Sequence, residues 1–362
     1  MTSELATRVR PAEPADVTQI ADLFASVFRG RSKPNKTELN TYLTQLMFSH
    51  PNYTPDNGSI VSVDGTGNVK SVLVILPMTY RIGEEPVTAR LACAFMAADD
   101  ANPRSIAALI FQLRPRVNQI SFSDSAAPVS VSHLKAIGGV ELPVQSLRWY
   151  KVFKPLPAAT GYVRRRVSQK YPALLHQGSL PFPASMSGSR TASGFSASPV
   201  DVDMYAQYAN QFLASYTVAP VYSAPDLDWT IKASSDALGQ GRLVLAQVQD
   251  GNGVVNGVFS FVGARGGEAQ ILDLLWQTGK QEAVVDTVFT SLKEAGFAFA
   301  SAQVRPEIIP ALSKQKGIWY RHVTGVSAAS RSPEFKQAMQ SGQAYIGGVA
   351  GESWSRLVHD FY

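Results

Sequence analysis

The chain has 362 residues, of which 45% are hydrophobic and 17% charged, and its formal net charge is +5. Such a chain is longer than the roughly 250 residues of a usual single core, so we expect two domains of a soluble globular protein. Its single cysteine, Cys93, excludes an intramolecular disulfide and a thiolate metal cluster. No apolar run reaches the roughly 18 residues of a membrane span, and the first residues lack the apolar core of a signal peptide, so we expect a cytoplasmic protein without a membrane span.

The first half predicts alternating helices and strands. A short strand ends at Val9 and Arg10, and Asp16 can cap the helix that follows it. Two strands flank a turn at Asp64-Gly65-Thr66-Gly67, and a hairpin leads into an apolar central strand. The predicted elements are helices at 17–28, 36–48, 104–113 and 129–137, and strands at 59–64, 69–76, 87–97, 119–123 and 147–153, the last closing this half.

The same order of elements returns after a segment rich in Pro, Ser, Gly and Arg. The turn Asp250-Gly251-Asn252-Gly253 echoes the turn that begins at Asp64. We therefore predict a tandem repeat, with an N-terminal domain at 1–155, a linker at 156–198 and a C-terminal domain at 199–362. The elements predicted in the second half are helices at 202–213, 227–237, 280–295 and 307–314, and strands at 242–249, 254–262, 268–276, 297–304 and 318–323.

The central strand, the polar loop after it and the next helix predict an anion-binding geometry. The free N–H groups of a first helical turn and the positive end of the helix dipole suit a phosphate or pyrophosphate. An ordinary strand-loop-helix crossover is the alternative reading. Nucleic acid is not the expected ligand, because the basic residues are dispersed apart from Arg164, Arg165 and Arg166.

The opening VRPAEPADVTQIADLFASVF and the repeated element order carry a resemblance to a known family. Both halves resemble the GNAT superfamily of N-acetyltransferases, and FSDSAAPVSVSHLKAIGGVELPVQSLRWYKVFKPL is similar to the end of bacterial acyltransferase-like proteins linked to polysaccharide or lipid conjugation. The resemblance implies an α/β fold (α+β, with mixed sheets) of two tandem GNAT-like acyl-CoA N-acyltransferase domains. It also implies an acetyl-CoA or other acyl-CoA cofactor.

In that family a loop with the pattern Gln/Arg-x-x-Gly-x-Gly/Ala holds the pyrophosphate of coenzyme A. The matching residues here are Asn102-Pro103-Arg104-Ser105-Ile106-Ala107. Ile106 and Ala107 fit the pattern, whereas Asn102 and Ser105 replace the long polar residue and the glycine, and Pro103 removes one N–H donor. The resemblance further implies that Phe95, Met96 and Ala97 offer backbone groups to the pantetheine and the acyl carbonyl.

The second half lacks this cradle pattern. Its corresponding loop, Gln277-Thr278-Gly279-Lys280, has a single glycine. We therefore expect coenzyme A to bind only the first half, and we assign the second half a structural or substrate-shaping role.

Acyl transfer to an amine needs a group that removes the amine proton and a group that protonates or shields the departing thiolate. Asp124 follows a strand's carboxyl end, where ligands of α/β sheets gather, so it is a candidate base or the residue of an Asx-turn. His133 is a second candidate base, or else a packing or surface residue. Tyr150 is a candidate acid on the thiol side, or a core aromatic. For Asp99 and Asp100, helix capping competes with catalysis.

Three functions remain open from the sequence. The first is an N-acyltransferase, an N-acetyltransferase in the first instance, acting on a small-molecule, sugar or peptide-precursor amine. The second is a non-catalytic tandem GNAT-like binding protein, and the third is an aminoacyl-tRNA-dependent ligase. A homodimer is also left open. The sequence does not distinguish the acceptor or the acyl chain length.

Overall fold

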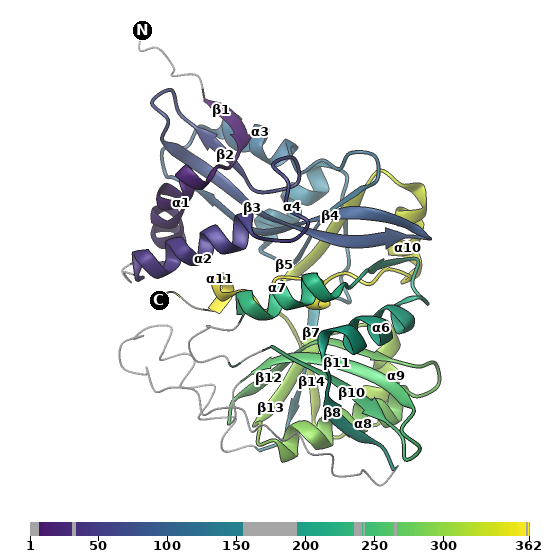
Figure 1. Cartoon of the computed structure of the whole chain (residues 1–362). Coiled ribbons are helices and arrows are strands. Elements are labelled where there is room, and N and C mark those ends of the chain that lie inside the picture. The colour runs from purple at the N-terminus through teal and green to yellow at the C-terminus, as the bar shows by residue number, and fades with distance from the viewer. Residues whose placement is uncertain are drawn as a thin grey trace.

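The computed structural model describes residues 7–30, 34–154, 194–234, 241, 243–263, 266–359 and 361. Within these ranges the strands form two mixed sheets, one above the other in Figure 1, with helices against them. The first sheet has the order β1-β2-β3-β4-β5-β15-β6, with β9 paired to β3, and the second has the order β14-β7-β13-β12-β11-β10-β8. The mixed α/β class predicted from the sequence is confirmed.

The strands of the first sheet are β1 (Arg8–Pro11), β2 (Ile60–Val63), β3 (Val69–Ile82), β4 (Glu85–Ala97), β5 (Gln119–Ala126), β6 (Val140–Glu141), β9 (Val218–Pro220) and β15 (Gly325–Ser330). Those of the second sheet are β7 (Leu147–Val152), β8 (Ser196–Pro199), β10 (Leu243–Gln249), β11 (Val255–Gly263), β12 (Glu268–Trp276), β13 (Phe299–Gln303) and β14 (Ile318–His322). The α-helices are α1 (Val17–Phe24), α2 (Lys36–Phe48), α3 (Pro103–Phe111), α4 (Pro128–Ala136), α6 (Val202–Leu213), α7 (Ala224–Ser234), α8 (Gln281–Glu294), α9 (Ile309–Ser313), α10 (Pro333–Ser341) and α11 (Arg356–His359).

The two halves exchange strands, because the first half gives β7 to the second sheet and the second half gives β9 and β15 to the first sheet. β7 pairs antiparallel with β13 and β14, so it does not close the first half as predicted. β15, which comes from the second half, lies between β5 and β6 in the first sheet, where β7 was expected. The residues of β7 form a strand as expected, but which sheet a strand joins depends on long-range pairing that its own pattern does not encode. The exchange ties the two halves into one structure.

The predicted linker is only partly covered by the structure. Its end, Ser196–Pro199, is β8 and pairs with β10, so it belongs to the second sheet. Residues 155–193 lie outside the described ranges, and with them the cluster of Arg164, Arg165 and Arg166. The domain boundaries at 155 and 199 therefore remain a prediction.

The tandem repeat is visible in the turns as well as in the strand order. Oδ1 of Asp64 accepts hydrogen bonds from the backbone N–H groups of Thr66 and Asn68, at 2.9 and 3.0 Å. Oδ1 of Asp250 accepts from the N–H groups two and four residues later, at 2.9 and 3.1 Å. Each aspartate thus fixes the hairpin between the second and third strands of its own sheet, as Asx-turns do.

Apolar faces of the helices pack where the spacing predicts them. The face of α2 that carries Leu39, Tyr42, Leu43, Leu46 and Met47 is buried. On the side of the first sheet where α3 and α4 lie, Leu109 and Leu134 join a separate cluster with Ile75 of β3. In the second sheet Trp149 of β7 packs edge-on against Phe289 of α8, with ring centroids 5.5 Å apart.

Asp16 differs from its predicted role as a helix cap. Its carboxylate forms an ion pair with Arg10 of β1 at 2.7 Å and accepts a 2.8 Å hydrogen bond from the N–H of Glu13. No capping hydrogen bond to the start of α1 is found in this part of the described chain. Asp16 therefore joins the first strand to the first helix.

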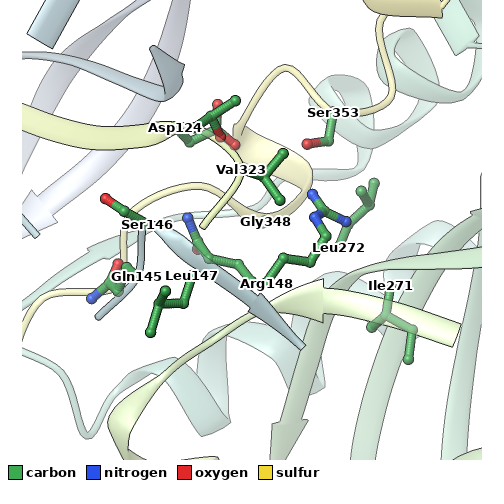
Figure 2. Close-up of a pocket in the computed structure, with 12 residues that line it drawn as sticks. Asp124, Gln145, Ser146, Leu147, Arg148, Ile271, Leu272, Val323, Gly348 and Ser353 are labelled. Carbon is green, nitrogen blue, oxygen red and sulfur yellow. The ribbon is translucent and has the colours of Figure 1, made fainter. Parts of the chain in front are cut away.

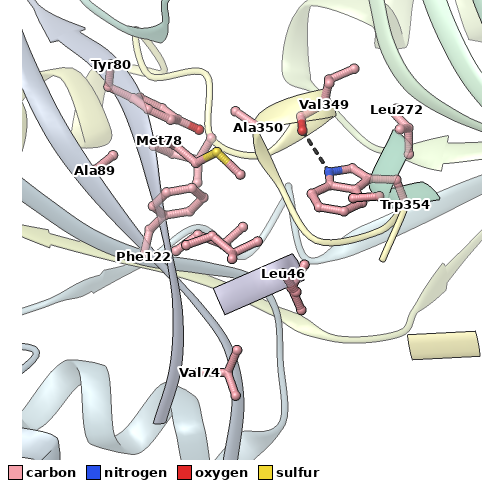
Figure 3. Close-up of a cluster of buried hydrophobic side chains, with 14 of the residues drawn as sticks. Leu46, Val74, Met78, Tyr80, Ala89, Phe122, Leu272, Val349, Ala350 and Trp354 are labelled. Atoms are coloured by element: carbon pink, nitrogen blue, oxygen red, sulfur yellow. Dashed lines mark hydrogen bonds between the residues drawn. The ribbon is translucent and has the colours of Figure 1, made fainter. Parts of the chain in front are cut away.

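The C-terminal segment, residues 344–357, runs between the two sheets and belongs to the largest hydrophobic cluster. Figure 3 shows Trp354 with its Nε1–H donating to the carbonyl of Val349 at 2.9 Å, close to Leu46 of α2 and Leu272 of β12. The Trp354 ring also packs edge-on against Trp229 of α7. This segment therefore fills the junction of the two halves.

Candidate active site

The central strand β4 separates from its parallel neighbour β5 partway along. The two strands pair from Thr88 opposite Gln119 to Leu91 opposite Phe122. Beyond that point β4 continues to Ala97 and β5 to Ala126 without pairing with each other. The two strands are therefore splayed, and Phe95, Met96 and Ala97 lie on the β4 side of the opening, paired only with β3.

Both strands carry a bulge where they separate. On β4 the register to β3 shifts between Val74 and Ile75, which leaves Cys93 as the extra residue. On β5 the register to β15 shifts between Ser123 and Ala126, so that Asp124 and Ser125 lie opposite Val326 alone. Bulges bend a strand and redirect its side chains, and they are common beside functional sites.

The buried carboxyl group of Asp124 lies at this opening and contacts the C-terminal segment. Its side chain is 9% exposed, and its Oδ1 accepts a 3.1 Å hydrogen bond from the N–H of Glu352. The segment approaches so closely that a Cβ atom at Gly351 would lie 1.9 Å from Oδ2 of Asp124. Glu352 itself accepts a hydrogen bond from the hydroxyl of Ser125, so two carboxyl groups meet at one end of β5.

Burial controls the protonation of this group of residues. It raises the pKa of Asp124, although the nearby guanidinium groups of Arg148 and Arg305 act in the opposite direction. Burial and the neighbouring Asp124 raise the pKa of Glu352 well above its usual value. The pKa of the Cys93 thiol is also raised, by burial and then by the same two carboxyl groups, so Cys93 is unsuited as a nucleophile. A carboxyl group with a raised pKa is a better proton acceptor near neutral pH.

The structure brings His133 and Phe95 together but not His133 and Asp124. The His133 ring, on α4, lies edge-on to Phe95 of β4 with centroids 5.6 Å apart. Partial burial lowers the pKa of His133, so its imidazole is neutral at pH 7. Phe95 and its neighbour Ala92 pack on the cluster under α3 and α4, whereas Cys93 packs on the opposite, interior cluster. His133 therefore lies on the α3–α4 side of the splay and the two carboxyl groups on its inner side.

Tyr150 lies on β7 in the second sheet. Its ring stacks on Trp319 of β14 with centroids 4.3 Å apart and planes inclined by 16°. Leu147 and Arg148 of the same strand line a pocket with Asp124, but Tyr150 does not. The alternative prediction for Tyr150, a core aromatic, is only partly met, because Tyr150 is half-buried whereas its neighbour Trp149 is fully buried.

The loop predicted to hold pyrophosphate opens α3. Asn102 caps the helix, with its Oδ1 accepting from the N–H of Arg104 at 2.9 Å, so neither Asp99 nor Asp100 is the cap. Ser105 is 6% exposed, and its hydroxyl donates to the carbonyl of Asn102 at 2.7 Å. Arg104 and Ala107 are exposed, and Ile106 is half-buried.

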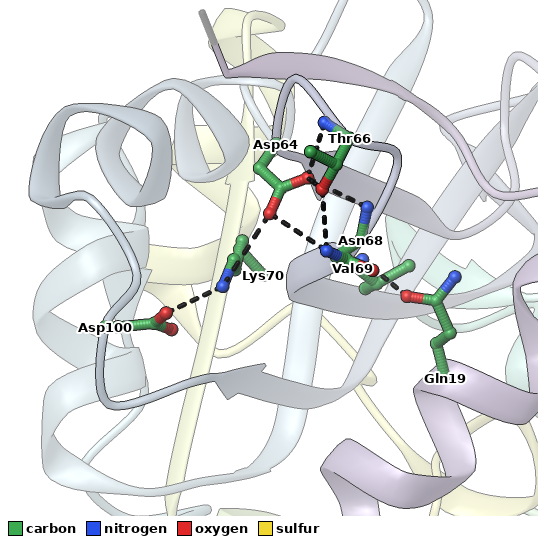
Figure 4. A network of polar contacts seen from close by, with 7 residues as sticks. All are labelled: Gln19, Asp64, Thr66, Asn68, Val69, Lys70 and Asp100. Carbon is green, nitrogen blue, oxygen red and sulfur yellow. Dashed lines mark hydrogen bonds and ion pairs between the residues drawn. The ribbon is translucent and has the colours of Figure 1, made fainter. Parts of the chain in front are cut away.

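Lys70 anchors the chain in front of this loop, as Figure 4 shows. Its ammonium group lies 2.7 Å from the carboxylate of Asp100 and 3.7 Å from that of Asp64. The turn between β2 and β3 is thereby joined to the connection between β4 and α3. Asp100 thus connects the loop before α3 to β3 through an exposed ion pair.

A pocket opens on the inner side of Asp124, at the junction of the two sheets (Figure 2). It is lined by Asp124, Gln145, Ser146, Leu147, Arg148, Ile271, Leu272, Gln303, Val323, Thr324, Gly348 and Ser353. Residues 145–148 and 323–324 belong to the stretches where the chain crosses between the sheets. Asp124 therefore lies between the splay of the first sheet and this pocket.

The described ranges contain neither a candidate metal site nor a helix that could span a membrane. No group of three or more His, Cys, Asp or Glu side chains among these residues could hold a metal ion. No helix in the same part of the chain is long and apolar enough to cross a membrane.

Comparison with solved structures identifies the fold. The chain is similar to a probable N-acyltransferase of unknown function from Enterococcus faecalis V583, with a TM-score of 0.55 and 10% identity. The similarity covers 89% of this chain and 72% of that protein. A GCN5-related N-acetyltransferase from Anabaena variabilis ATCC 29413 gives the same coverage and TM-score at 13% identity. A GCN5-related N-acetyltransferase from Kribbella flavida gives a TM-score of 0.52 at 10% identity, over 89% of this chain and 71% of that protein. The predicted resemblance to the GNAT superfamily is thus confirmed at the level of the fold.

Comparison of the sequence itself gives no relative. No protein-family model matches the chain, and no curated protein matches it. The fold is therefore the finding that connects this chain to known proteins.

Sequence reasoning missed Glu352, Gln145 and Arg148. The run of glycines at 347, 348 and 351 was the available signal for the first of these, because closely spaced glycines mark backbone that approaches another group closely. Gln145 and Arg148 carry no such signal, since they reach the site only through the exchange of β7.

Proposed function

We propose that the chain is an N-acyltransferase that moves an acyl group, acetyl in the first instance, from acyl-CoA to the amine of a small acceptor. The observation that carries the proposal is the position of Asp124, a buried carboxyl group between the β4–β5 splay and the pocket at the sheet junction. The GNAT-like neighbours, which are described as N-acyl- or N-acetyltransferases, support the same general class.

The acyl-CoA would lie along the splay on the α3–α4 side. Phe95, Met96 and Ala97 would flank the pantetheine, with His133 against Phe95. The start of α3 would face the pyrophosphate, where Arg104 supplies a positive charge and the helix dipole adds to it. Ser105 leaves the outer face of the loop open because its side chain points inward. The bound cofactor would supply an activated thioester.

Asp124 would remove the proton of the attacking amine. Its raised pKa makes it a stronger base than an exposed aspartate, and its place beside the pocket lets it reach an amine there. Glu352 would keep Asp124 in place through its N–H and hold a second exchangeable proton nearby. His133 would remain neutral on the cofactor side.

The test compares Asp124→Asn with Asp203→Asn, an exposed aspartate on α6. Acetyl-CoA affinity is measured by isothermal titration and transfer to a panel of amines by release of free thiol. We expect Asp124→Asn to retain acetyl-CoA affinity while transfer falls by about 10²-fold or more, and Asp203→Asn to match the wild type. Transfer by Asp124→Asn at the wild-type rate would contradict the assigned base.

A second candidate, a tandem protein without catalysis, is favoured by one feature of the cofactor loop. Pro103 has no N–H, and Asn102 already occupies the N–H of Arg104, so the loop offers few free donors to a pyrophosphate. Absence of heat on titration with both coenzyme A and acetyl-CoA would favour this candidate over the enzyme.

A further inference from the structure

The pocket beside Asp124 coincides with the splay of the second sheet. β12 pairs with β13 only from Glu268 opposite Phe299 to Gln270 opposite Ser301. The next residues of β12, Ile271 and Leu272, line the pocket together with Gln303 of β13. Because the loop before α8 lacks a phosphate cradle, this second opening is available to a ligand other than coenzyme A.

The pocket contains opposite charges from different elements. Asp124 supplies a carboxyl group from β5, and Arg148 supplies a guanidinium group from β7. Arg148 is close enough to Asp124 for its charge to favour the ionised carboxylate. One guanidinium nitrogen of Arg148 donates to the hydroxyl of Ser301 at 3.0 Å, and Figure 2 shows the side chain reaching across the pocket. The two residues can therefore bind a ligand that carries both a positive and a negative group.

Gln145 adds a polar group that lacks a partner. Its side chain is 5% exposed, and its Nε2 donates to the carbonyl of Ala344 at 3.1 Å, which fixes the amide. The Oε1 atom accepts no hydrogen bond from any described residue. A buried acceptor without a partner is costly, so a ligand that donates a hydrogen bond there would be favoured. An ammonium group is such a donor.

We propose that this pocket binds the acceptor, and that the acceptor is a small amine that also carries a carboxylate and an apolar side chain. The inference rests on the proposed function and names its substrate class. The ammonium group would face Asp124 and Oε1 of Gln145, and the carboxylate would face Arg148. The apolar part would contact Leu147, Ile271, Leu272 and Val323. An aliphatic amino acid has this combination of groups.

The first measurement uses the wild-type chain without coenzyme A. Leucine, leucinamide and 4-methylpentanoate are titrated at millimolar concentration and followed by NMR of the ligands. We expect leucine to bind more tightly than leucinamide, which lacks the carboxylate, and than 4-methylpentanoate, which lacks the amine. Equal binding of the three probes, or no binding of leucine, would overturn the proposal.

The second measurement asks whether Arg148 is the carboxylate partner. Arg148→Gln is compared with Arg321→Gln, which changes the exposed arginine paired with it on β14 and outside the pocket. In Arg148→Gln, loss of a charge-assisted contact should weaken leucine binding on the order of tenfold and leave leucinamide binding unchanged. In Arg321→Gln, the affinity for leucine should equal that of the wild type. Equal weakening of leucine and leucinamide would overturn the assignment.

The two proposals fail separately. Leucine binding without any heat on titration with acetyl-CoA would support the proposed pocket and contradict the acyltransferase function. Acetyl-CoA binding and transfer to amines that lack a carboxylate, with no leucine binding, would retain the enzyme and remove this substrate class.

Discussion

The backbone N–H of Glu352 donates a 3.1 Å hydrogen bond to Oδ1 of Asp124, although the two residues are 228 positions apart in the chain. The same segment reaches the second sheet, where the N–H of Val349 donates to Asp273 of β12 at 3.3 Å. Asp273 is fully buried and also accepts hydrogen bonds from the hydroxyls of Tyr205, Tyr222 and Tyr345, at 3.0, 2.9 and 2.7 Å. The C-terminal segment is therefore held by one carboxyl group from each sheet.

Gly351 is expected to tolerate no side chain. A Cβ atom there would meet Oδ2 of Asp124 at 1.9 Å, so Gly351→Ala must displace the carboxyl group or the segment. We predict a loss of about 1–3 kcal/mol in the free energy of unfolding, measured by urea denaturation. Gly251→Ala is the matched control, because its nearest neighbour would be 3.9 Å away and its loss should stay within about 0.5 kcal/mol. Equal stability of the two variants would contradict the close approach.

Because Glu352 is buried, we expect the free energy of unfolding to fall as pH rises. Its pKa is raised in the folded state, so its favourable contribution is full below the unfolded pKa and is lost as pH rises through the folded value. Glu352→Gln should therefore gain stability relative to the wild type between pH 5 and pH 8. Denaturation at both pH values measures this, with Glu294→Gln, an exposed change on α8, as the control. A stability difference that does not change with pH would refute the burial of an ionisable group there.

Because His50 is buried, we expect its contribution to stability to depend on pH in the opposite direction. It is 4% exposed, packs edge-on against Trp229 at 4.4 Å, and burial lowers its pKa to about 4. Its favourable contribution is therefore present above pH 6.5 and is lost as pH falls toward 4, by roughly 3 kcal/mol at most. His50→Asn should remove this part of the acid sensitivity, whereas His322→Asn, at an exposed position, should not. Unfolding midpoints measured from pH 7 to pH 4 distinguish the outcomes, and parallel curves for wild type and His50→Asn would exclude the assignment.

Local patterns predict the fold far better than the site. The helix at 36–48 and the paired turns at Asp64 and Asp250 are predicted from spacing and turn chemistry alone, because both depend on neighbours in the chain. The placement of β7 and β15 is not, since any alternating strand can pair in either sheet. Asp124 was predicted from a position expected to follow a strand, although β5 runs on to Ala126 and includes it. Its partners Glu352 and Arg148 were not, because they reach it through the C-terminal segment and the strand exchange.

The central claim is that the first half alone binds acyl-CoA, and titration of three forms of the chain with acetyl-CoA tests it most directly. Arg104→Glu reverses the charge at the start of α3, and Lys280→Glu makes the same change at the corresponding loop before α8. We predict one binding site in the wild type, loss of binding in Arg104→Glu, and wild-type affinity in Lys280→Glu. No binding in the wild type, or loss in Lys280→Glu with retention in Arg104→Glu, would contradict the account.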